Sequence, residues 1–162
     1  MRSFSRICEI FITIILMFFV PMLYLSCQQE LLLQNFAQNQ VIYFVDSIRN
    51  VGYINQGMYD AFLENLHLTN HVYEVELSVY EKYRNSGSSK SYLLGTYTEE
   101  ILEKIYGEKE KYILHQGDYL SIAVRRKDYT RAERFLIFLG VTNISSETIP
   151  IQYGGMIRDE CF

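Results

Sequence analysis

Hydrophobic residues are concentrated in one uninterrupted run near the start of the chain, and basic residues stand in front of it. Residues 7–25 number about 19 and include a single charged residue, Glu9, and a helix of about 20 apolar residues suffices to cross the hydrocarbon layer of a membrane. Arg2 and Arg6 precede the run, and no Lys or Arg follows it before Arg49. The pattern predicts a single-pass anchor in the cell membrane, with the N-terminus in the cytoplasm and the rest of the chain outside.

Apolar positions continue beyond this run at the three- and four-residue spacing of a helix. The positions that keep this spacing are Leu32, Phe36, Ile42 or Phe44, Val45 and Ile48. Gly52 follows them, and glycine is the usual residue just after a helix end. We therefore expect one long helix, in which residues 1–27 form the cytoplasmic N-terminus and the anchor, and residues 28–52 form a stalk.

The remaining residues, 53–162, show short helical and alternating patterns that predict one extracytoplasmic domain. In chain order these are a helix within 54–70, a strand within 71–84, a helix within 98–111, a strand within 117–127, a helix from Thr130 to Gly140 and a strand around Ile149–Ile157. Three strands cannot close a barrel. The predicted fold class is therefore α+β, with a small, mostly antiparallel three-stranded sheet covered by short helices and by the stalk.

Several turn and cap residues add detail to this prediction. Thr98 is expected to cap its helix, and residues 85–91 (NSGSSKS) are expected to form an exposed loop. Pro150 fits the start or edge of a strand, and the pair Gly154-Gly155 indicates a bulge or a close approach to another backbone. The residues of the last helix expected to face inward are Ala132, Phe135, Leu136 and Leu139.

Composition argues against a disordered chain and against a nucleic-acid-binding one. The chain is 49% hydrophobic and 15% aromatic, which is too apolar for disorder. Its formal net charge is −4, and the part that follows residue 27 carries about −5. Because binding to phosphates needs a basic surface, we expect no nucleic-acid partner.

The three cysteines leave open what happens to the N-terminal segment. No pair or spacing typical of zinc ligands is present, and a bond between Cys27 and Cys161 is possible outside the cytoplasm. No cleavage site of small residues follows the apolar run, which favours a retained anchor. Two alternatives remain, a lipoprotein in which Cys27 carries the lipid, and a secretory signal that is removed.

Residues that could carry catalysis are sparse. His67 and His71 are four positions apart, but a predicted turn separates them and no third metal ligand is evident. The acidic residues between 99 and 110 suit a helix start and a solvated face better than acid–base chemistry. No nucleophile motif or phosphate-binding loop occurs. We expect neither an enzyme nor a cofactor or metal site.

Two groups of charged residues are candidates for partner contacts. Glu9 lies about one turn inside the membrane run, where it either reaches the headgroups or pairs with a basic group of a neighbouring chain. Five of the basic residues fall within ten positions, and they form either a solvated surface or a docking patch for an acidic partner or for the acidic face of another copy. They are Arg125, Arg126, Lys127, Arg131 and Arg134.

Three stretches of the chain carry a resemblance to a known family. They are VGYINQGMYDAFLENLHLTNHVYEVELSVYEKY, TEEILEKIYGEKEKYILHQGDYLSIAVRRK and the closing YGGMIRDE. Together with the apolar helix that contains Glu9, they resemble the TadE-like minor pilins of the tight-adherence (Flp, type IV-like) pilus systems of Gram-positive bacteria.

The resemblance implies a membrane-anchored structural subunit of a surface pilus or of a secretion or conjugation apparatus. Its partners would be other pilin-like subunits or platform proteins, in a homo- or hetero-oligomer. Glu9 would then correspond to the pilin glutamate that pairs with the N-terminus of a neighbouring subunit. The alternative function is an extracytoplasmic lipoprotein or anchored module that binds a ligand.

Overall fold

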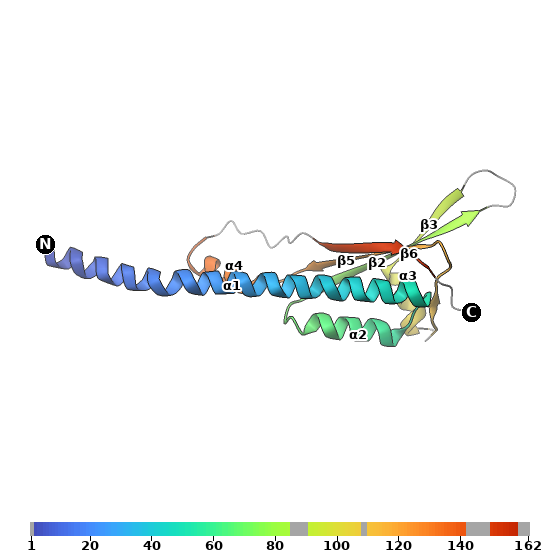
Figure 1. Ribbon diagram of the computed structural model, residues 1–162, viewed down its shortest axis with the longest axis horizontal. Helices are drawn as coiled ribbons and strands as arrows, with labels where there is room; N and C mark the ends of the chain where they lie inside the picture. Colours follow the sequence, from blue (N-terminus) through green and yellow to red (C-terminus); the bar gives the residue numbers. More distant parts are fainter. Residues whose placement is uncertain (1, 85–90, 108–109, 142–149, 159–162) are drawn as a thin grey trace. The chain divides into compact units, whose positions relative to one another are not determined.

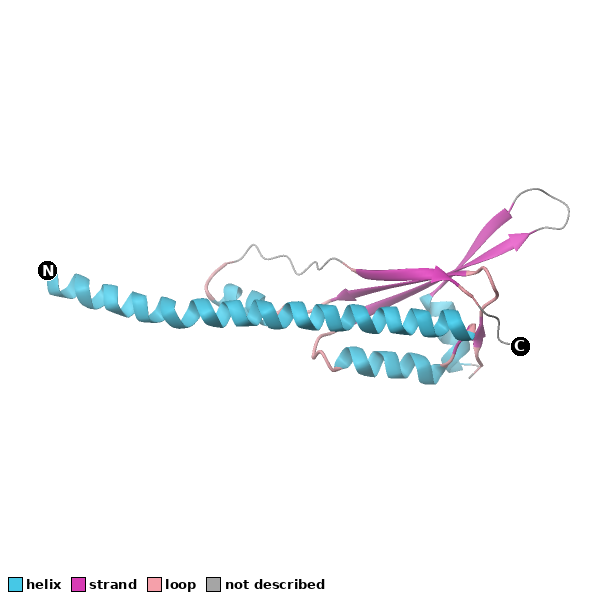
Figure 2. Ribbon diagram, viewed as in Figure 1, coloured by secondary structure: helices cyan, strands magenta, loops and turns pink. Residues whose placement is uncertain are grey.

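The computed structural model describes residues 2–84, 91–107, 110–141 and 150–158. Its contacts divide the chain into two compact units. Residues 1–35 and 129–144 make up the first, here called the anchor unit, and residues 36–128 and 145–162 make up the second, the sheet unit. The fold is α+β, with one long N-terminal helix and antiparallel sheets (Figures 1 and 2).

Helix α1, Arg2–Val51, is continuous for 50 residues and belongs to both units. It ends where the sequence predicts, because Gly52 adopts a φ of 77° and its N–H donates to the carbonyl of Ile48 at 2.8 Å. A positive φ carries no steric cost for glycine, which explains the choice of residue at this helix end. Pro21 lies inside α1 without ending it.

The main sheet has four strands in the order β3-β2-β5-β6, and every pairing is antiparallel. The strands are β2 (Tyr73–Arg84), β3 (Ser91–Tyr97), β5 (Tyr119–Arg126) and β6 (Ile151–Met156). The expectation of three strands is wrong. The missed strand, β3, lacks a clear alternation because two leucines stand side by side and Gly95 follows them.

A second sheet of two strands joins β1 (Tyr53–Ile54) to β4 (Tyr112–Ile113). Each of these strands has two residues, which is too short for a period of two to be recognised in the sequence. The pairing places the chain just after α1 beside the segment that follows the acidic helix.

The core of the sheet unit lies between the main sheet and two helices, the C-terminal half of α1 and α2 (Gln56–His67). The Asn55 side chain caps α2 by accepting from the Met58 N–H at 2.8 Å. The rings of Phe44 and Phe62 stack with centroids 4.3 Å apart, which joins the two helices. Residues of β2 and β5 that face this core are fully buried, namely Leu77, Val79, Leu120, Ile122 and Val124. The predicted alternation of these two strands is thus confirmed.

The predicted cap at Thr98 is wrong. Helix α3, Thr98–Leu102, has Tyr97 at its cap position, and no side chain bonds to its first turn. The Thr98 hydroxyl instead accepts from the Leu77 N–H at 2.8 Å and donates to the Leu77 carbonyl at 3.2 Å. It satisfies the backbone of β2 at the position where the β2–β3 ladder stops. A π-helical turn, Glu103–Gly107, continues α3 and ends at Gly107.

The two glycines of β6 allow close contacts, as the sequence suggests. A Cβ atom added to Gly154 would lie 2.6 Å from the carbonyl oxygen of Leu120 in the neighbouring strand. A Cβ added to Gly155 would lie 2.6 Å from the guanidinium carbon of Arg49. Arg49 donates from Nε to the Met156 carbonyl at 2.9 Å, so the end of α1 is bonded directly to the edge strand.

Helix α4, Arg131–Phe138, belongs to the anchor unit and is capped at both ends. Thr130 and Glu133 form a reciprocal capping box at its start. At its end the N–H groups of Gly140 and Val141 donate to the carbonyls of Ile137 and Leu136. No residue of α4 is buried, and Leu139 is 54% exposed, so the expectation that Leu139 faces inward is wrong.

Candidate functional site

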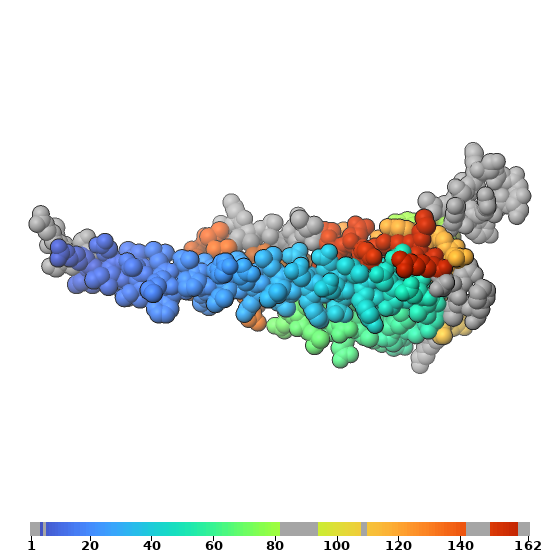
Figure 3. Space-filling model, in the orientation of Figure 1, coloured from blue at the N-terminus to red at the C-terminus, as the bar shows by residue number. Residues whose placement is uncertain are grey.

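The N-terminal half of α1 carries an uncovered apolar surface. In the part of the chain that the structure describes, this is the one helix long and apolar enough to cross a membrane. Its large side chains are widely exposed, for example Phe11 (66%), Met17 (75%) and Phe18 (72%). Figure 3 shows these first turns of α1, in blue, open on the face in view. An apolar surface of this extent normally meets a membrane or another protein.

Glu9 lies exposed on this apolar surface. Among the described residues, no hydrogen bond or ion pair reaches its carboxylate, while its backbone carbonyl accepts from the Thr13 hydroxyl at 2.8 Å. The Ser26 hydroxyl likewise donates to the Met22 carbonyl at 3.0 Å. Both hydroxyls are therefore satisfied within the helix, and the Glu9 carboxylate is an exposed charged group on an otherwise apolar surface.

Cys8 and Cys27 are free thiols, and both are exposed on α1. Cys161 lies outside the described residues, so its predicted pairing with Cys27 stays a prediction. At Cys27 the helix continues without a break.

The five clustered basic residues fall into different units. Arg125, Arg126 and Lys127 belong to the sheet unit, whereas Arg131 and Arg134 belong to α4 in the anchor unit. The docking-patch interpretation stays a prediction.

The basic residues at the end of β5 have acidic neighbours on β2. Arg125 lies 3.6 Å from Glu76, and Lys127 lies 2.7 Å from Glu74, measured between charged atoms. Arg126 donates from Nε to the Asp128 carbonyl at 3.1 Å. These cross-strand pairs compensate part of the positive charge, as opposite charges on adjacent strands commonly do.

The contacts of His71 and the position of His67 are typical of structural residues. The Nδ1 atom of His71 lies 2.9 Å from the Asp128 carboxylate, which also accepts from the Val72 N–H at 3.3 Å. His67 lies at the end of α2 and is exposed. Within the described ranges, no three His, Cys, Asp or Glu side chains are close enough together to hold a metal ion.

Three tyrosine hydroxyls in the sheet unit have raised pKa values. Burial raises the pKa of Tyr106 to about 12, and a hydrogen bond to Asp60 adds to the shift. Burial also raises the pKa of Tyr59, with a further contribution from Asp60. Burial raises the pKa of Tyr112 against the opposing effect of a hydrogen bond with Thr96. All three hydroxyls therefore stay protonated at neutral pH, where they serve as hydrogen-bond donors and not as bases.

Sequence reasoning missed an aromatic surface on the outer side of the main sheet, here called the tyrosine face: Tyr80, Tyr97 and Tyr119. The rings of Tyr80 and Tyr119 lie 6.4 Å apart, and Tyr97 is 58% exposed. The Tyr97 hydroxyl lies over Gly95, 3.3 Å from where a Cβ would be. Exposed tyrosines are enriched at protein interfaces. The alternation in β2 and β5 points Tyr80 and Tyr119 outward, but the face emerges fully only once β3 is recognised.

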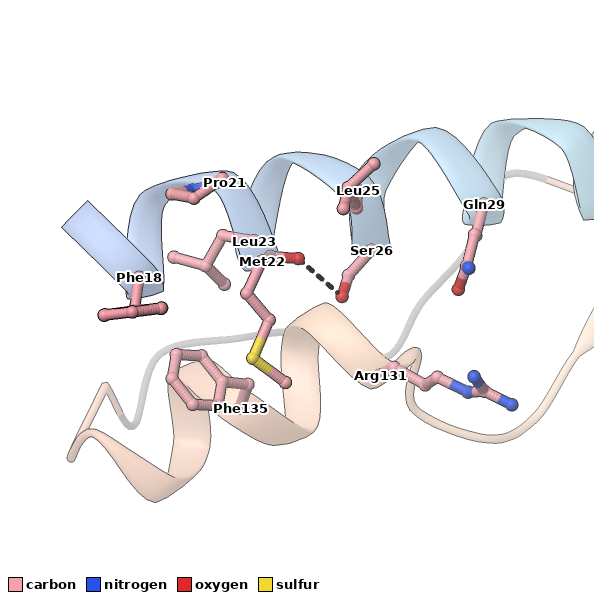
Figure 4. Close-up of a pocket in the computed structure, with 9 residues that line it drawn as sticks. All are labelled: Phe18, Pro21, Met22, Leu23, Leu25, Ser26, Gln29, Arg131 and Phe135. Carbon is pink, nitrogen blue, oxygen red and sulfur yellow. Dashed lines mark hydrogen bonds between the residues drawn. The ribbon is translucent and has the colours of Figure 1, made fainter. Parts of the chain in front are cut away.

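A second missed feature is an open cavity between α1 and α4, with a volume of about 510 Å³. Figure 4 shows the side chains that line it, which are Phe18, Pro21, Met22, Leu23, Leu25, Ser26, Gln29, Arg131 and Phe135. The rings of Phe19 and Phe135 lie 5.2 Å apart beside it. The sequence places these two segments more than 100 positions apart, so only the fold brings them together.

Comparison with protein-family models, with curated proteins and with solved structures finds no match to this chain.

Proposed function

We propose that this protein is a membrane-anchored structural subunit, similar to a minor pilin or pseudopilin, of a surface pilus or of a secretion or conjugation apparatus. The observation that carries the proposal is the division of α1. Its first half exposes apolar side chains along its length, and its second half supplies Ala37, Val41, Phe44, Val45 and Ile48 to the core of the sheet unit. This division supports a helix that anchors the chain with its first half and packs in a folded domain with its second half.

Three further features support a role in assembly. The carboxylate of Glu9 is exposed, and a charge within a membrane tends to be paired. A basic group of a neighbouring helix would supply the partner. The tyrosine face offers a surface for contacts between subunits outside the membrane. The resemblance to TadE-like pilins favours the same role. The proposed orientation, with the N-terminus in the cytoplasm and the sheet unit outside, follows from Arg2 and Arg6.

The experiment tests Glu9 in the native membrane. Glu9→Gln removes the charge and keeps the shape of the side chain, and Glu64→Gln changes an exposed glutamate of α2 as the control. We expect Glu9→Gln to lower co-purification with assembly partners about tenfold, which corresponds to about 1.4 kcal/mol, while the control leaves it unchanged. Equal membrane content of both variants, measured by immunoblot, shows that the loss concerns assembly.

A native chain that purifies from detergent as a monomer without partners would overturn the proposal. Cys8 provides a second readout, because it is exposed beside Glu9. In a Cys27→Ser background, oxidation of membranes should yield a Cys8-linked species that the Glu9→Gln variant loses.

The alternative function, an extracytoplasmic lipoprotein or anchored ligand-binding module, is supported by the exposed thiol of Cys27 at the end of the apolar segment. Mass spectrometry of the mature N-terminus separates the two. A diacylated Cys27 at the N-terminus excludes the retained helix, and a chain that keeps residues 7–25 excludes lipidation of this kind.

A further inference from the structure

Helix α4 runs antiparallel to the segment of α1 that leaves the predicted membrane span. Phe135 lies against Phe18 and Met22, while Arg131, at the other end of the cavity, lies toward Ser26 and Gln29 (Figure 4). Each residue of a helix advances about 1.5 Å. If residues 7–25 cross the hydrocarbon, then Gln29 and Arg131 lie at the level of the headgroups, and Phe135 lies below them in the acyl layer.

The deep end of α4 is apolar and uncovered. The exposed fractions of its side chains there are 43% for Ile137, 82% for Phe138, 54% for Leu139 and 45% for Val141. In water such a cluster would be unfavourable, because each large apolar side chain that stays exposed forgoes the free energy gained by its burial. In the acyl layer the same exposure costs nothing.

Backbone N–H groups that follow α4 are also satisfied within the helix end. A helix end in hydrocarbon must satisfy its polar groups internally. The Gly140 N–H donates to the Ile137 carbonyl at 3.0 Å, and the Val141 N–H donates to the Leu136 carbonyl at 3.1 Å. Gly140 has a φ of 88°, and this conformation permits both hydrogen bonds at the helix end. The opposite end, at Thr130, is satisfied by the capping box with Glu133.

The cavity itself is amphiphilic. Aromatic and aliphatic side chains line most of it, and its polar end carries Gln29 and the guanidinium of Arg131. Among the described residues, no hydrogen bond or ion pair reaches the Arg131 guanidinium, whereas the nearby charged side chains of Glu30 and Arg134 each have interactions of their own. A cation without a partner among the described residues, at headgroup level above an apolar groove, matches the chemistry of a phospholipid, with its phosphate and its acyl chain.

We propose that the cavity between α1 and α4 binds one membrane phospholipid, with its phosphate at Arg131 and Gln29 and an acyl chain against Met22 and Phe135, while the Phe138 end of α4 lies in the acyl layer. The inference rests on the membrane anchoring contained in the proposed function. It makes α4 a second membrane contact, which fixes the rotation of α1 about its own axis and thereby the face that α1 presents to neighbouring helices.

The first test measures lipid retention by the full chain. The protein is reconstituted in vesicles of phosphatidylcholine and phosphatidylglycerol, extracted in mild detergent and analysed by native mass spectrometry. The wild type should keep one phospholipid. Arg131→Gln should lower its occupancy about tenfold, because it removes the charge-assisted hydrogen bonds between the guanidinium and the phosphate. Arg125→Gln, at an exposed arginine of the sheet unit, is the matched control and should change nothing.

The second test measures the depth of α4 with a nitroxide label. Phe138→Cys and, as control, Val72→Cys are labelled in a Cys8→Ser, Cys27→Ser, Cys161→Ser background. In vesicles the label at 138 should relax with oxygen, which partitions into acyl chains, and be shielded from a water-soluble nickel reagent. The label at 72 should respond to the nickel reagent.

The outcomes separate this inference from the proposed function. If the wild type does not float with vesicles, both fail. If it floats but the label at 138 contacts water, or if Arg131→Gln keeps the lipid as the wild type does, the lipid site fails while the anchor stands. If the label at 138 is shielded from oxygen and from nickel alike, the Phe138 end of α4 packs on another protein, which also overturns the proposal.

Discussion

Gly154 lies in β6 against the neighbouring strand β5, and the nearest atom to an added Cβ would be a backbone atom. A Cβ at this position would meet the Leu120 carbonyl oxygen at 2.6 Å and the Cα of Ser121 at 3.1 Å. Main-chain atoms in the middle of a sheet cannot move aside as a side chain can. The glycine is therefore required by packing between strands.

We predict that Gly154→Ala lowers the free energy of unfolding of the sheet unit by about 1–3 kcal/mol, the usual effect of overpacking. Thermal unfolding of the detergent-solubilised chain, followed by circular dichroism, measures it. Gly57→Ala is the control, because Gly57 lies within α2 and an added Cβ there would be 3.8 Å from the nearest atom. It should be neutral or stabilising by up to about 1 kcal/mol. Equal effects at the two positions would contradict the packing argument.

The raised pKa of Tyr106 predicts that the folded chain loses stability at alkaline pH. Its pKa in the folded chain is raised to about 12 from 10, so the folded state holds its proton more tightly than the unfolded state does. The stability that this pKa shift contributes is then fully present below about pH 10 and is lost as the pH rises toward 12. Chemical unfolding between pH 9 and 12 should show this loss, and Tyr106→Phe should reduce its slope. An unchanged slope in the variant would place the effect elsewhere, for example at Tyr59 or Tyr112, whose pKa values are also raised.

At the scale of single elements, Thr98 joins a helix start to a strand. Its hydroxyl both accepts from and donates to the backbone of Leu77. Threonine at a helix start is usually explained as a cap, and the first turn of α3 contains two acids as a capped helix would. Here the Thr98 side chain makes the hydrogen bonds to Leu77 that a further backbone pairing of β2 with β3 would have made. The β2–β3 ladder therefore ends at this point.

We predict that Thr98→Val costs about 1–3 kcal/mol, because it leaves the Leu77 N–H and carbonyl unpaired. Thr98→Ser keeps the hydroxyl and should cost less. Thr98→Asp distinguishes the two roles, because aspartate is a good cap but a carboxylate cannot donate to the Leu77 carbonyl. Urea unfolding of the three variants gives the order. A Thr98→Asp variant as stable as wild type would restore the capping interpretation.

The elements that could be predicted from the sequence are those whose pattern repeats over several turns or residues. The long helix and its end at Gly52, the amphipathic α2 and the alternating strands β2 and β5 are of this kind. Strand β3 could not be predicted, because its formation depends on pairing with β2 and its own pattern is interrupted at Gly95. The two-residue strands β1 and β4 exist only through each other.

The candidate site was predictable only in part, for a similar reason. The apolar span and Glu9 are visible in the sequence because they lie in one continuous segment. The cavity joins segments far apart in the chain, and the exposed apolar end of α4 looks like an ordinary buried face when the sequence is considered alone. Ile137 and Phe138 can be assigned to the surface only once the neighbours of α4 are known.

At the scale of the whole molecule, α1 serves two environments. Ile48 is fully buried in the core of the sheet unit, whereas Ile10, on the same helix, is 61% exposed. The same residue type thus has a different energetic role at each end, which makes a matched pair of substitutions possible.

We predict that Ile48→Ala lowers the unfolding free energy of the sheet unit by about 2–5 kcal/mol, the cost of a cavity in a packed core. Ile10→Ala should leave it unchanged, since no packed core surrounds Ile10. Urea unfolding in detergent micelles, with tyrosine fluorescence as the signal, compares the two. If Ile10→Ala destabilised the sheet unit as much as Ile48→Ala, the two halves of α1 would not be energetically separate.

The bond between Arg49 and the edge strand gives α1 a mechanical consequence. The guanidinium holds the carbonyl of Met156, and the Arg158 N–H donates back to the Arg49 carbonyl at 3.0 Å. A tensile load on the last turns of α1 would reach the edge strand through these two hydrogen bonds. Unwinding the end of α1 and loosening the edge strand would then be one mechanical event.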